Sequence, residues 1–471
     1  MPNAATPPIR ALLEHALRHV ATYRESLGQR PVAPLVDVDR LRAALGGELC
    51  DPGGDPQRVI DELVAGAEPG LVTTTGPRYF GFVTGGALDA ATCADILATG
   101  WDQCAFNAVL SPAAAVVEEV VGAWLKQLIG LPGDASFGLV SGGQAGNTVA
   151  LAAARNHVLA QAGWDVERDG LHHAPAIHVV ASEERHATID RALRLLGFGT
   201  RCVVEVPATR NGAIEVAALT QTLEALPAGP RIVCLQAGNV NTGACDDLRA
   251  ACGVARARGA WAHVDGAFGL WAAVSPVTRH LVDGVELADS WTVDGHKWLN
   301  VPYGSGYVFC AHPEAHRRSM QLRASYLQGS DAAAPVRTPA DYVPESSRRA
   351  TGFATWAALR ELGRHGVAAL VERCCALARR FATQLGEIDG VTIGNDVVLN
   401  QVLVHFGSDA RTDDVIAAIQ QGGTCWMGGT QRRGRRYMRV AVSNWSTTEA
   451  DVDQSVAAIT AILVRPRPSR S

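Results

Sequence analysis

Short apolar runs alternate with helical segments through the middle of the chain, and this alternation most constrains the fold. From about residue 70, amphipathic stretches such as 112–129 and 146–162 are interleaved with runs rich in Val and Ile. These runs are 176–181, 202–206, 232–236, 261–264 and 306–310. Runs of this length between helices are typical of buried parallel strands that are covered on both faces. We therefore predict an α/β protein with a doubly wound sheet.

The two ends of the chain follow other patterns, which predicts three domains. Residues 1–68 have helical spacing and few strand signals, so we expect a helical arm with little core of its own. Residues 69–350 contain the predicted sheet. A Pro- and Ala-rich loop at 328–345 precedes the last domain, 351–471, where helices and short strands predict an α+β fold. The arm needs to pack on the main body or on another subunit.

Composition narrows the class of protein. The chain has 471 residues, of which 47% are hydrophobic and 19% charged, as expected of a soluble enzyme. A net charge of −5 argues against nucleic acid or an anionic membrane as the main partner. No signal peptide is recognised at the start, and no apolar run reaches the roughly 18 residues of a membrane span. The eleven cysteines are scattered without a C-x-x-C pair, so we expect thiols in a cytoplasmic protein and no metal site.

Polar residues follow several predicted strands, at the edge of the sheet where ligands bind in such folds. The segment 141–147, SGGQAGN, leads into a helix and suits a phosphate, although glycine pairs are also ordinary turns. His186 follows one strand, where it could stack on a flat ring, act as acid or base, or cap the next helix. Asp265 follows another, and an unpaired carboxylate there suits a cation such as a protonated pyridine nitrogen.

Lys297 lies between His296 and Trp298 in the segment 290–309, SWTVDGHKWLNVPYGSGYVF. These surroundings are largely apolar, and desolvation makes such a place costly for an ammonium group. A neutral lysine is what Schiff-base chemistry with a carbonyl cofactor requires, although an isolated lysine at a strand end is more often a surface residue. The phosphate loop, the histidine, the aspartate and the lysine together match each part of one cofactor. We therefore predict a pyridoxal phosphate (PLP) site.

The chain also resembles the group II PLP-dependent amino-acid decarboxylases, relatives of aromatic-L-amino-acid and glutamate decarboxylase. The resemblance runs from about Pro77 to Trp445 and is most specific in HVDGAFG (263–269) and DGHKWLNVPYGSG (294–306). It implies the PLP-dependent transferase fold of the aspartate aminotransferase type (fold type I). In this fold a mainly parallel seven-stranded sheet forms the large domain, beside a smaller α+β C-terminal domain. It also implies a homodimer with the active site at the subunit interface.

The resemblance assigns roles to individual residues. Lys297 would carry the cofactor as an internal aldimine, His186 would stack on its ring, and Asp265 would pair with the ring nitrogen. Ala267 would pack on the ring's other face. Tyr326, 29 residues beyond Lys297, would return a proton to Cα, unless it only anchors its loop. Family members with phenylalanine at this position tend to produce aldehydes. The expected cofactor-binding residues are Gly143, Gln144, His186, Asn239, Asp265, Ala267, Asp294, His296 and Lys297.

Two positions depart from the family pattern. Ala145-Gly146 stand where the phosphate loop usually has a glutamate and a small residue, and Asn239 replaces a threonine. Both departures bear on the identity of the substrate. Aromatic residues at 79–106 would suit an aromatic or bulky apolar amino acid, although such residues are more often core. They are Tyr79, Phe80, Phe82, Trp101 and Phe106.

The expected function is that of a carboxy-lyase of amino-acid metabolism, which converts an L-amino acid into an amine and CO₂. Asp265 would keep the pyridine ring protonated, and the bond to the carboxylate would stand perpendicular to that ring. One alternative is another reaction on the same scaffold: aldehyde formation, transamination or carbon–carbon lyase chemistry. A second alternative, from a different class, is a catalytically silent relative that binds the cofactor or partner proteins for regulation.

Overall fold

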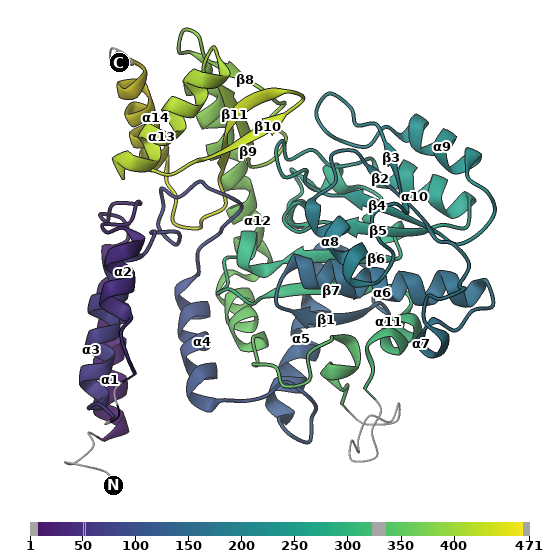
Figure 1. Ribbon diagram of the computed structural model, residues 1–471, viewed down its shortest axis with the longest axis horizontal. Helices are drawn as coiled ribbons and strands as arrows, with labels where there is room; N and C mark the ends of the chain where they lie inside the picture. Colours follow the sequence, from purple (N-terminus) through teal and green to yellow (C-terminus); the bar gives the residue numbers. More distant parts are fainter. Residues whose placement is uncertain (1–7, 50, 52, 323–335, 465–471) are drawn as a thin grey trace.

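The computed structural model describes residues 8–49, 51, 53–322 and 336–464 and divides into three regions. Figure 1 shows a helical arm (purple) along one flank, a large sheet with its helices on the other side, and a smaller sheet near the C-terminal helix. Within the described ranges, no helix combines the length and apolarity needed to cross a membrane.

The large sheet has seven strands in the order β1-β7-β6-β5-β4-β2-β3. The strands are β1 (Ser136–Val140), β2 (His178–Ser182), β3 (Val203–Val206), β4 (Arg231–Gln236), β5 (Trp261–Asp265), β6 (Ser290–Asp294) and β7 (Gly306–Cys310). β6, β5, β4, β2 and β3 are parallel, and β7 is antiparallel to both β6 and β1. The prediction of a mainly parallel seven-stranded sheet is confirmed. The carboxyl ends of all strands except β7 therefore lie along one edge.

The prediction that 306–310 is a parallel strand is wrong. β6 ends at Asp294 and β7 begins at Gly306, opposite each other in the register. The connection between them is shorter than the crossover of a dozen or more residues that a parallel neighbour requires. The chain therefore turns back on itself, and β7 fills the space between β6 and β1. β1 and β6 had not been singled out as strands from their composition.

Alternate residues of the buried strands pack into two hydrophobic clusters, one on each face. Val179 and Ile232 join the cluster under α6 and α8, whereas Val180 and Val233 join the cluster under α5, α9 and α10. Because both faces are covered, these strands are apolar throughout rather than alternating. The helices of this region are α4 (Asp89–Trp101), α5 (Pro112–Ile129), α6 (Gly143–Gln161), α7 (Val166–Asp169), α8 (Ala187–Leu195), α9 (Val216–Ala225), α10 (Leu248–Ala257) and α11 (Pro313–Met320).

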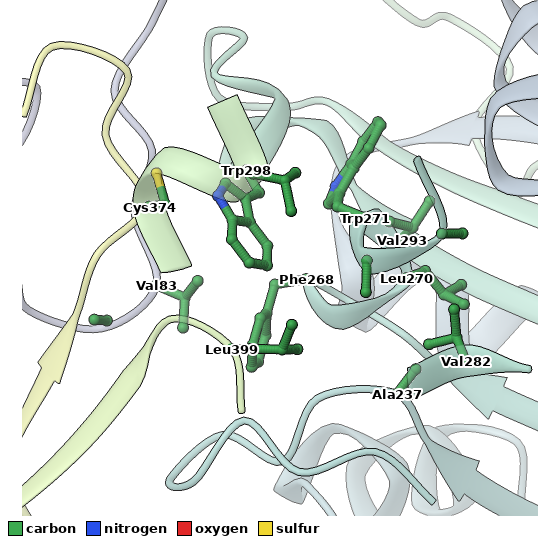
Figure 2. Close-up of a cluster of buried hydrophobic side chains, with 14 of the residues drawn as sticks. Val83, Ala237, Phe268, Leu270, Trp271, Val282, Val293, Trp298, Cys374 and Leu399 are labelled. Atoms are coloured by element: carbon green, nitrogen blue, oxygen red, sulfur yellow. The ribbon is translucent and has the colours of Figure 1, made fainter. Parts of the chain in front are cut away.

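Trp298, the residue after the predicted cofactor lysine, is anchored in this core. Its indole is 1% exposed and lies 6.4 Å from the ring of Phe268, centroid to centroid. Figure 2 shows Trp298 and Phe268 together with Leu399, Val83 and Cys374, which come from regions far apart in the sequence. The backbone that presents Lys297 is therefore fixed by the same core that joins the large sheet to the C-terminal region.

The C-terminal region begins with the long helix α12 (Gly352–Gly386), which breaks at Gly363, where φ is 57°. A four-stranded antiparallel sheet follows in the order β10-β11-β9-β8, with helices α13 and α14. Its elements are β8 (Thr392–Ile393), β9 (Gln401–His405), α13 (Asp409–Gly422), β10 (Gly428–Arg432), β11 (Arg435–Ala441) and α14 (Glu449–Val464). This is the α+β arrangement that the sequence predicts.

The arm consists of α1 (Ile9–Ser26), α2 (Val38–Leu45) and α3 (Pro56–Ala67). Asp37 and Asp55 cap α2 and α3, because each side chain accepts hydrogen bonds from backbone N–H groups of the first turn. Neither α1 nor α2 has a fully buried residue, and α3 has only Gly66. The arm therefore has little core of its own, as expected.

Candidate active site

A cavity of about 410 Å³ opens at the carboxyl edge of the large sheet. It is lined by the segments that follow β1, β2, β4, β5 and β6. Most residues predicted for the site meet here. They are Gly143, Gln144, His186, Asp265, Ala267, Asp294, His296 and Lys297. Residues scattered over more than 150 positions thus come together because parallel strands end at a common edge.

The segment after β1 forms one wall, where α6 begins at Gly143. The first N–H groups of a helix have no partner inside it, so this positive end suits an anion. Glycine is required nearby because β7 approaches closely: a Cβ on Gly306 would lie 2.5 Å from Gly142 Cα. The Oε1 atom of Gln144 is buried and has no hydrogen-bond partner among the described residues.

Lys297 lies in a single turn of π-helix, Gly295–Leu299, directly after β6. Asn300 ends the turn in a left-handed conformation (φ 56°), and its amide donates to the carbonyl of Ser443 at 3.0 Å. The Nζ atom of Lys297 lies 3.0 Å from Oδ2 of Asp294, whose side chain is 2% exposed. In these largely apolar surroundings the amine therefore has one buried carboxylate partner.

His296 and Asp294 leave unpaired polar atoms at the cavity. Within the described part of the chain, His296 Nδ1 and Asp294 Oδ1 have no hydrogen-bond partner. Burial lowers the pKa of His296, with a smaller opposing effect from Asp294. Buried polar atoms are seldom left unpaired in folded proteins, so these atoms indicate a polar ligand. Together with an amine, a carboxylate and a helix start, they fit the phosphate, carbonyl and ring nitrogen of PLP.

Asp265 ends β5 and is held by a chain of buried side chains that points toward it. Asn147 Nδ2 donates to Asp265 Oδ2 at 2.9 Å, since a carboxylate only accepts. Asn147 Oδ1 must then accept from His263 Nε2 at 3.0 Å, so the proton of this imidazole lies on Nε2. His263 Nδ1 accepts in turn from the hydroxyl of Ser290 at 3.0 Å, and Ser290 Oγ accepts from Trp261 at 2.9 Å. We call Trp261, Ser290, His263 and Asn147 the aspartate relay.

Burial keeps the relay in one protonation state. It lowers the pKa of His263 to about 4, so the ring is neutral and cannot turn into a double donor at ordinary pH. Asp265 accepts a second hydrogen bond from the backbone N–H of Ala267 at 3.2 Å. Its carboxylate is therefore fixed in orientation by both oxygens.

His186 caps α8 from the end of the β2 loop. Its Nδ1 atom accepts from the backbone N–H of Thr188 at 3.3 Å, and burial lowers its pKa, so the ring is a neutral, flat surface. The loop is tied to the C-terminal sheet, because Arg432 makes a two-pronged ion pair with Glu184 at 2.8 and 2.9 Å. His186 is thus positioned by residues from both sheets.

Two predicted residues are not placed in the cavity. The structure puts Asn239 just outside it, fully buried, with its amide nitrogen 3.3 Å from Glu184 and its Oδ1 accepting from Asn241 N–H. Its side chain is therefore engaged in holding its own loop, and the role of Asn239 at the cofactor stays a prediction. Tyr326 lies outside the described residues.

The aromatic residues near 79–106 do not form one wall. Phe80 is 1% exposed and packs edge-on against Phe381 in the core. Trp101 is 52% exposed and contacts Phe353. Val83, Phe268 and Tyr303 supply apolar and aromatic lining to the cavity instead.

Arg439 was missed because it comes from the C-terminal sheet. It lies on β11, donates to the carbonyl of Val240 at 2.7 Å, and its charge acts on His186. Burial lowers the pKa of its guanidinium, and no carboxylate within the described ranges forms an ion pair with it. A half-buried cation without an acidic partner suits an anionic ligand beside it. No sequence pattern around Arg439 indicates that it lies near His186.

Comparison with known proteins agrees with this geometry. A family model described as the pyridoxal-dependent decarboxylase conserved domain matches residues 48–406. An aromatic-L-amino-acid decarboxylase from Bacillus atrophaeus is 25% identical over 96% of this chain and 95% of its own length. A 4-hydroxyphenylacetaldehyde synthase from Rhodiola rosea is 25% identical over 92% and 90%. The structure of Oryza sativa TDC with PLP and tryptamine has a TM-score of 0.90 at 23% identity, covering 98% and 99% of the two chains.

The mainly parallel seven-stranded sheet beside a smaller α+β region is the fold type I arrangement of PLP-dependent enzymes. The family model covers well over half of the chain, so the protein belongs to the pyridoxal-dependent decarboxylases. Its cofactor is pyridoxal phosphate, and its reaction is the decarboxylation of an amino acid.

Proposed function

We propose that Lys297 attaches the cofactor and that Asp265 holds the proton on its ring nitrogen. The observation that carries this assignment is the convergence of both groups, with the start of α6, on one cavity. The sequence contains only one other lysine, Lys126, whose amine donates to the backbone carbonyls of Gly133 and Ala135 outside the cavity. Gly143, Gln144 and His296 would hold the phosphate, with Asp294 beside them.

The remaining residues orient the reacting groups. PLP, when bound, supplies an electron-accepting ring that stabilises the negative charge left at Cα after CO₂ departs. His186 offers a flat neutral surface for stacking, and Ala267 leaves room on the other side. The aspartate relay fixes Asp265, so that its carboxylate keeps one orientation toward the ring nitrogen. Tyr326 would return a proton to Cα, as its position in the sequence suggests.

Arg439 is our candidate for binding the carboxylate that every amino-acid substrate carries. Its guanidinium is largely buried near His186 and Tyr79, and burial raises the pKa of Tyr79 to about 12, which keeps that phenol neutral. The apolar lining from Val83, Phe268 and Tyr303 suits a large apolar or aromatic side chain. We therefore infer an aromatic or bulky apolar L-amino acid as substrate.

We also propose a cytoplasmic homodimer with the active site at the subunit interface. Apolar residues exposed on this chain support a partner: Ile9 on α1 is 70% exposed, Val109 81% and Leu110 59%. The ten cysteines of the described residues are all free thiols, which suits a reducing compartment. We propose domain boundaries at 68/69 and 350/351, the second directly before α12.

Replacing Lys297 tests the central assignment. Lys297→Ala should lose the visible absorbance of lysine-bound cofactor and all turnover, whereas Lys126→Ala should keep both. Borohydride reduction followed by peptide mapping should place the cofactor on Lys297 alone, because the chain has only two lysines to choose between. Label on Lys126, or retained absorbance in Lys297→Ala, would refute the assignment.

Product analysis separates decarboxylation to the amine from formation of an aldehyde. The aldehyde alternative is tested because the similar protein from Rhodiola rosea is a 4-hydroxyphenylacetaldehyde synthase. We expect Tyr326→Phe to keep bound cofactor and, with O₂ as the oxidant, to shift the product from amine toward aldehyde, ammonia and H₂O₂. A screen of the twenty amino acids for CO₂ release identifies the substrate first. If amine output is unchanged in the variant, Tyr326 is not the proton donor.

A further inference from the structure

Three side chains on the inner side of the helical arm converge on one point, far from the cavity. His15 and His19 lie one turn apart on α1, and their Nε2 atoms are 3.3 Å apart. Asp61 on α3 faces both, with Oδ1 2.6 Å from His15 and 3.2 Å from His19. Ligand atoms around a tetrahedral zinc ion with bonds of about 2.0–2.1 Å are separated by about 3.3 Å. We propose that these three residues, the arm site, bind a divalent transition-metal ion such as Zn²⁺.

The donor set determines the class of ion. Two imidazole nitrogens and one carboxylate oxygen suit Zn²⁺ and its transition-metal neighbours, whereas Ca²⁺ and Mg²⁺ prefer oxygen alone. Histidines at positions i and i+4 share one face of a helix, which lets both rings reach a single ion. The fourth coordination position would be taken by water, as in zinc sites with three protein ligands.

The arm has a structural use for such an ion. α1 and α2 contain no fully buried residue, so apolar packing alone holds the three helices together weakly. A metal bound between α1 and α3 would act as a cross-link, as metals do in small folds that lack a core. The exposed apolar residues of α1, such as Leu13 and Leu17, lie on another face and leave the arm site free.

One neighbouring residue competes with the ion. The Nη2 atom of Arg18 donates to His15 Nδ1 at 3.0 Å, which places the proton of a neutral His15 on Nε2. When Nε2 binds a metal, that proton moves to Nδ1 and Arg18 must turn away. Arg18 is exposed and free to do so, but it opposes binding through both its contact and its charge. Removing Arg18 should therefore strengthen metal binding.

Cysteine spacing predicted no metal site, because these ligands are not cysteines. The His-x-x-x-His spacing of residues 15–19 is visible in the sequence, but Asp61 lies 42 positions after His19 and joins it only in the fold. The arm site is independent of the cofactor, so failure of one proposal leaves the other standing.

Equilibrium dialysis of the full-length, PLP-saturated protein against Zn²⁺, followed by elemental analysis, tests the proposal. The wild type should retain about one zinc per chain more than His19→Ala or Asp61→Asn, and each variant should bind it more than about 100-fold more weakly. His172→Ala is the matched control, because His172 and His173 form an exposed pair that, among the described residues, is part of no metal-ligating cluster. This control should bind zinc like the wild type.

Arg18→Ala gives a second, opposite readout, since its zinc affinity should rise severalfold. Zinc should also slow proteolytic cleavage of the arm in the wild type and not in His19→Ala, while cofactor absorbance stays the same in both. Equal zinc content in the wild type, His19→Ala and Asp61→Asn would overturn the proposal. Zinc content that falls equally in His172→Ala would overturn it as well.

Discussion

At the scale of residues, the active site depends on how two carboxylates are held. Asp294 is buried beside Lys297, at 3.0 Å from its amine, whereas Asp265 is held by backbone and by the aspartate relay. Among the described residues, Asp294 Oδ1 has no hydrogen-bond partner and lies 3.8 Å from His296 Nε2, whereas both oxygens of Asp265 accept hydrogen bonds. Asp265 is thus preorganised for a single partner, and a fixed charge is worth more in a dry site than one that must reorient.

The neutral histidine of the relay gives a pH prediction. Burial lowers the pKa of His263 to about 4, whereas the same residue in an unfolded chain has a pKa of about 6.5. Between these values the unfolded chain binds a proton that the folded chain does not. The free energy of unfolding therefore falls as pH drops from about 6.5 to about 4, by about 1.4 kcal/mol per pH unit. Above pH 6.5 His263 contributes no pH dependence.

Urea unfolding of the wild type and of His263→Gln across this range measures the effect. The variant should show a smaller slope of unfolding free energy against pH. The difference should be about 1.4 kcal/mol per pH unit, which corresponds to one bound proton. His316, whose pKa burial lowers to about 3, contributes equally to both proteins and cancels. Identical slopes would show that His263 is protonated in the folded state.

Residue types at strand ends predicted Lys297, His186 and Asp265, because one short motif carries each of them. Asn147 is the last residue of the motif SGGQAGN, but no role was predicted for it. Its partner His263 is 116 positions away in the sequence. Arg439 and Asn300 act across the two sheets, and no local pattern reports a contact of that kind. The hydrogen bonds that Asn239 makes within its own loop could not be predicted, because a resemblance transfers position but not the direction in which a new side chain hydrogen-bonds.

At the scale of elements, the turn between β6 and β7 carries the lysine and decides the sheet's topology. Short apolar runs predicted most strands, but hydrophobicity does not encode direction. The length of the connection does encode it: too few residues separate β6 from β7 for a crossover. The close approach of β7 to the start of α6 then follows, with glycine at both positions of contact.

That contact predicts the effect of a single methyl group. Gly306→Ala would place Cβ 2.5 Å from Gly142 Cα, so β7 and the start of α6 must move apart. We expect a loss of about 1–3 kcal/mol in unfolding free energy and weaker cofactor binding. Gly253→Ala, at an exposed position of α10, meets nothing within 4 Å and should instead stabilise by about 0.5–1 kcal/mol. Urea unfolding and cofactor titration of both variants check this, and equal effects would contradict it.

At the scale of the whole molecule, the arm exposes apolar surface that a lone chain leaves in water. Leu13 is 51% exposed and Leu17 42%, on a helix that has no fully buried residue. Such a face, like the exposed segment with Val109 and Leu110, is typical of a surface that another subunit covers.

Charge placed on this face tests the homodimer. Leu13→Asp should lower the mass measured by sedimentation velocity from that of a dimer toward that of a monomer, and turnover should fall with it. Leu195→Asp is the control, because Leu195 is 68% exposed on α8 and should leave the mass unchanged. A wild type that sediments as a fully active monomer would contradict the homodimer.

The contacts between the two sheets also set an order of events during synthesis of the chain. The loop of His186 is held by Arg432, and the turn of Lys297 is held through Asn300 by Ser443. Glu184, the ion-pair partner of Arg432, lies 248 positions earlier in the chain and is therefore synthesised well before it. A nascent chain that has already exposed its lysine therefore still lacks the supports of its own cavity. We therefore expect the cofactor to bind only after translation has passed β11, the last strand.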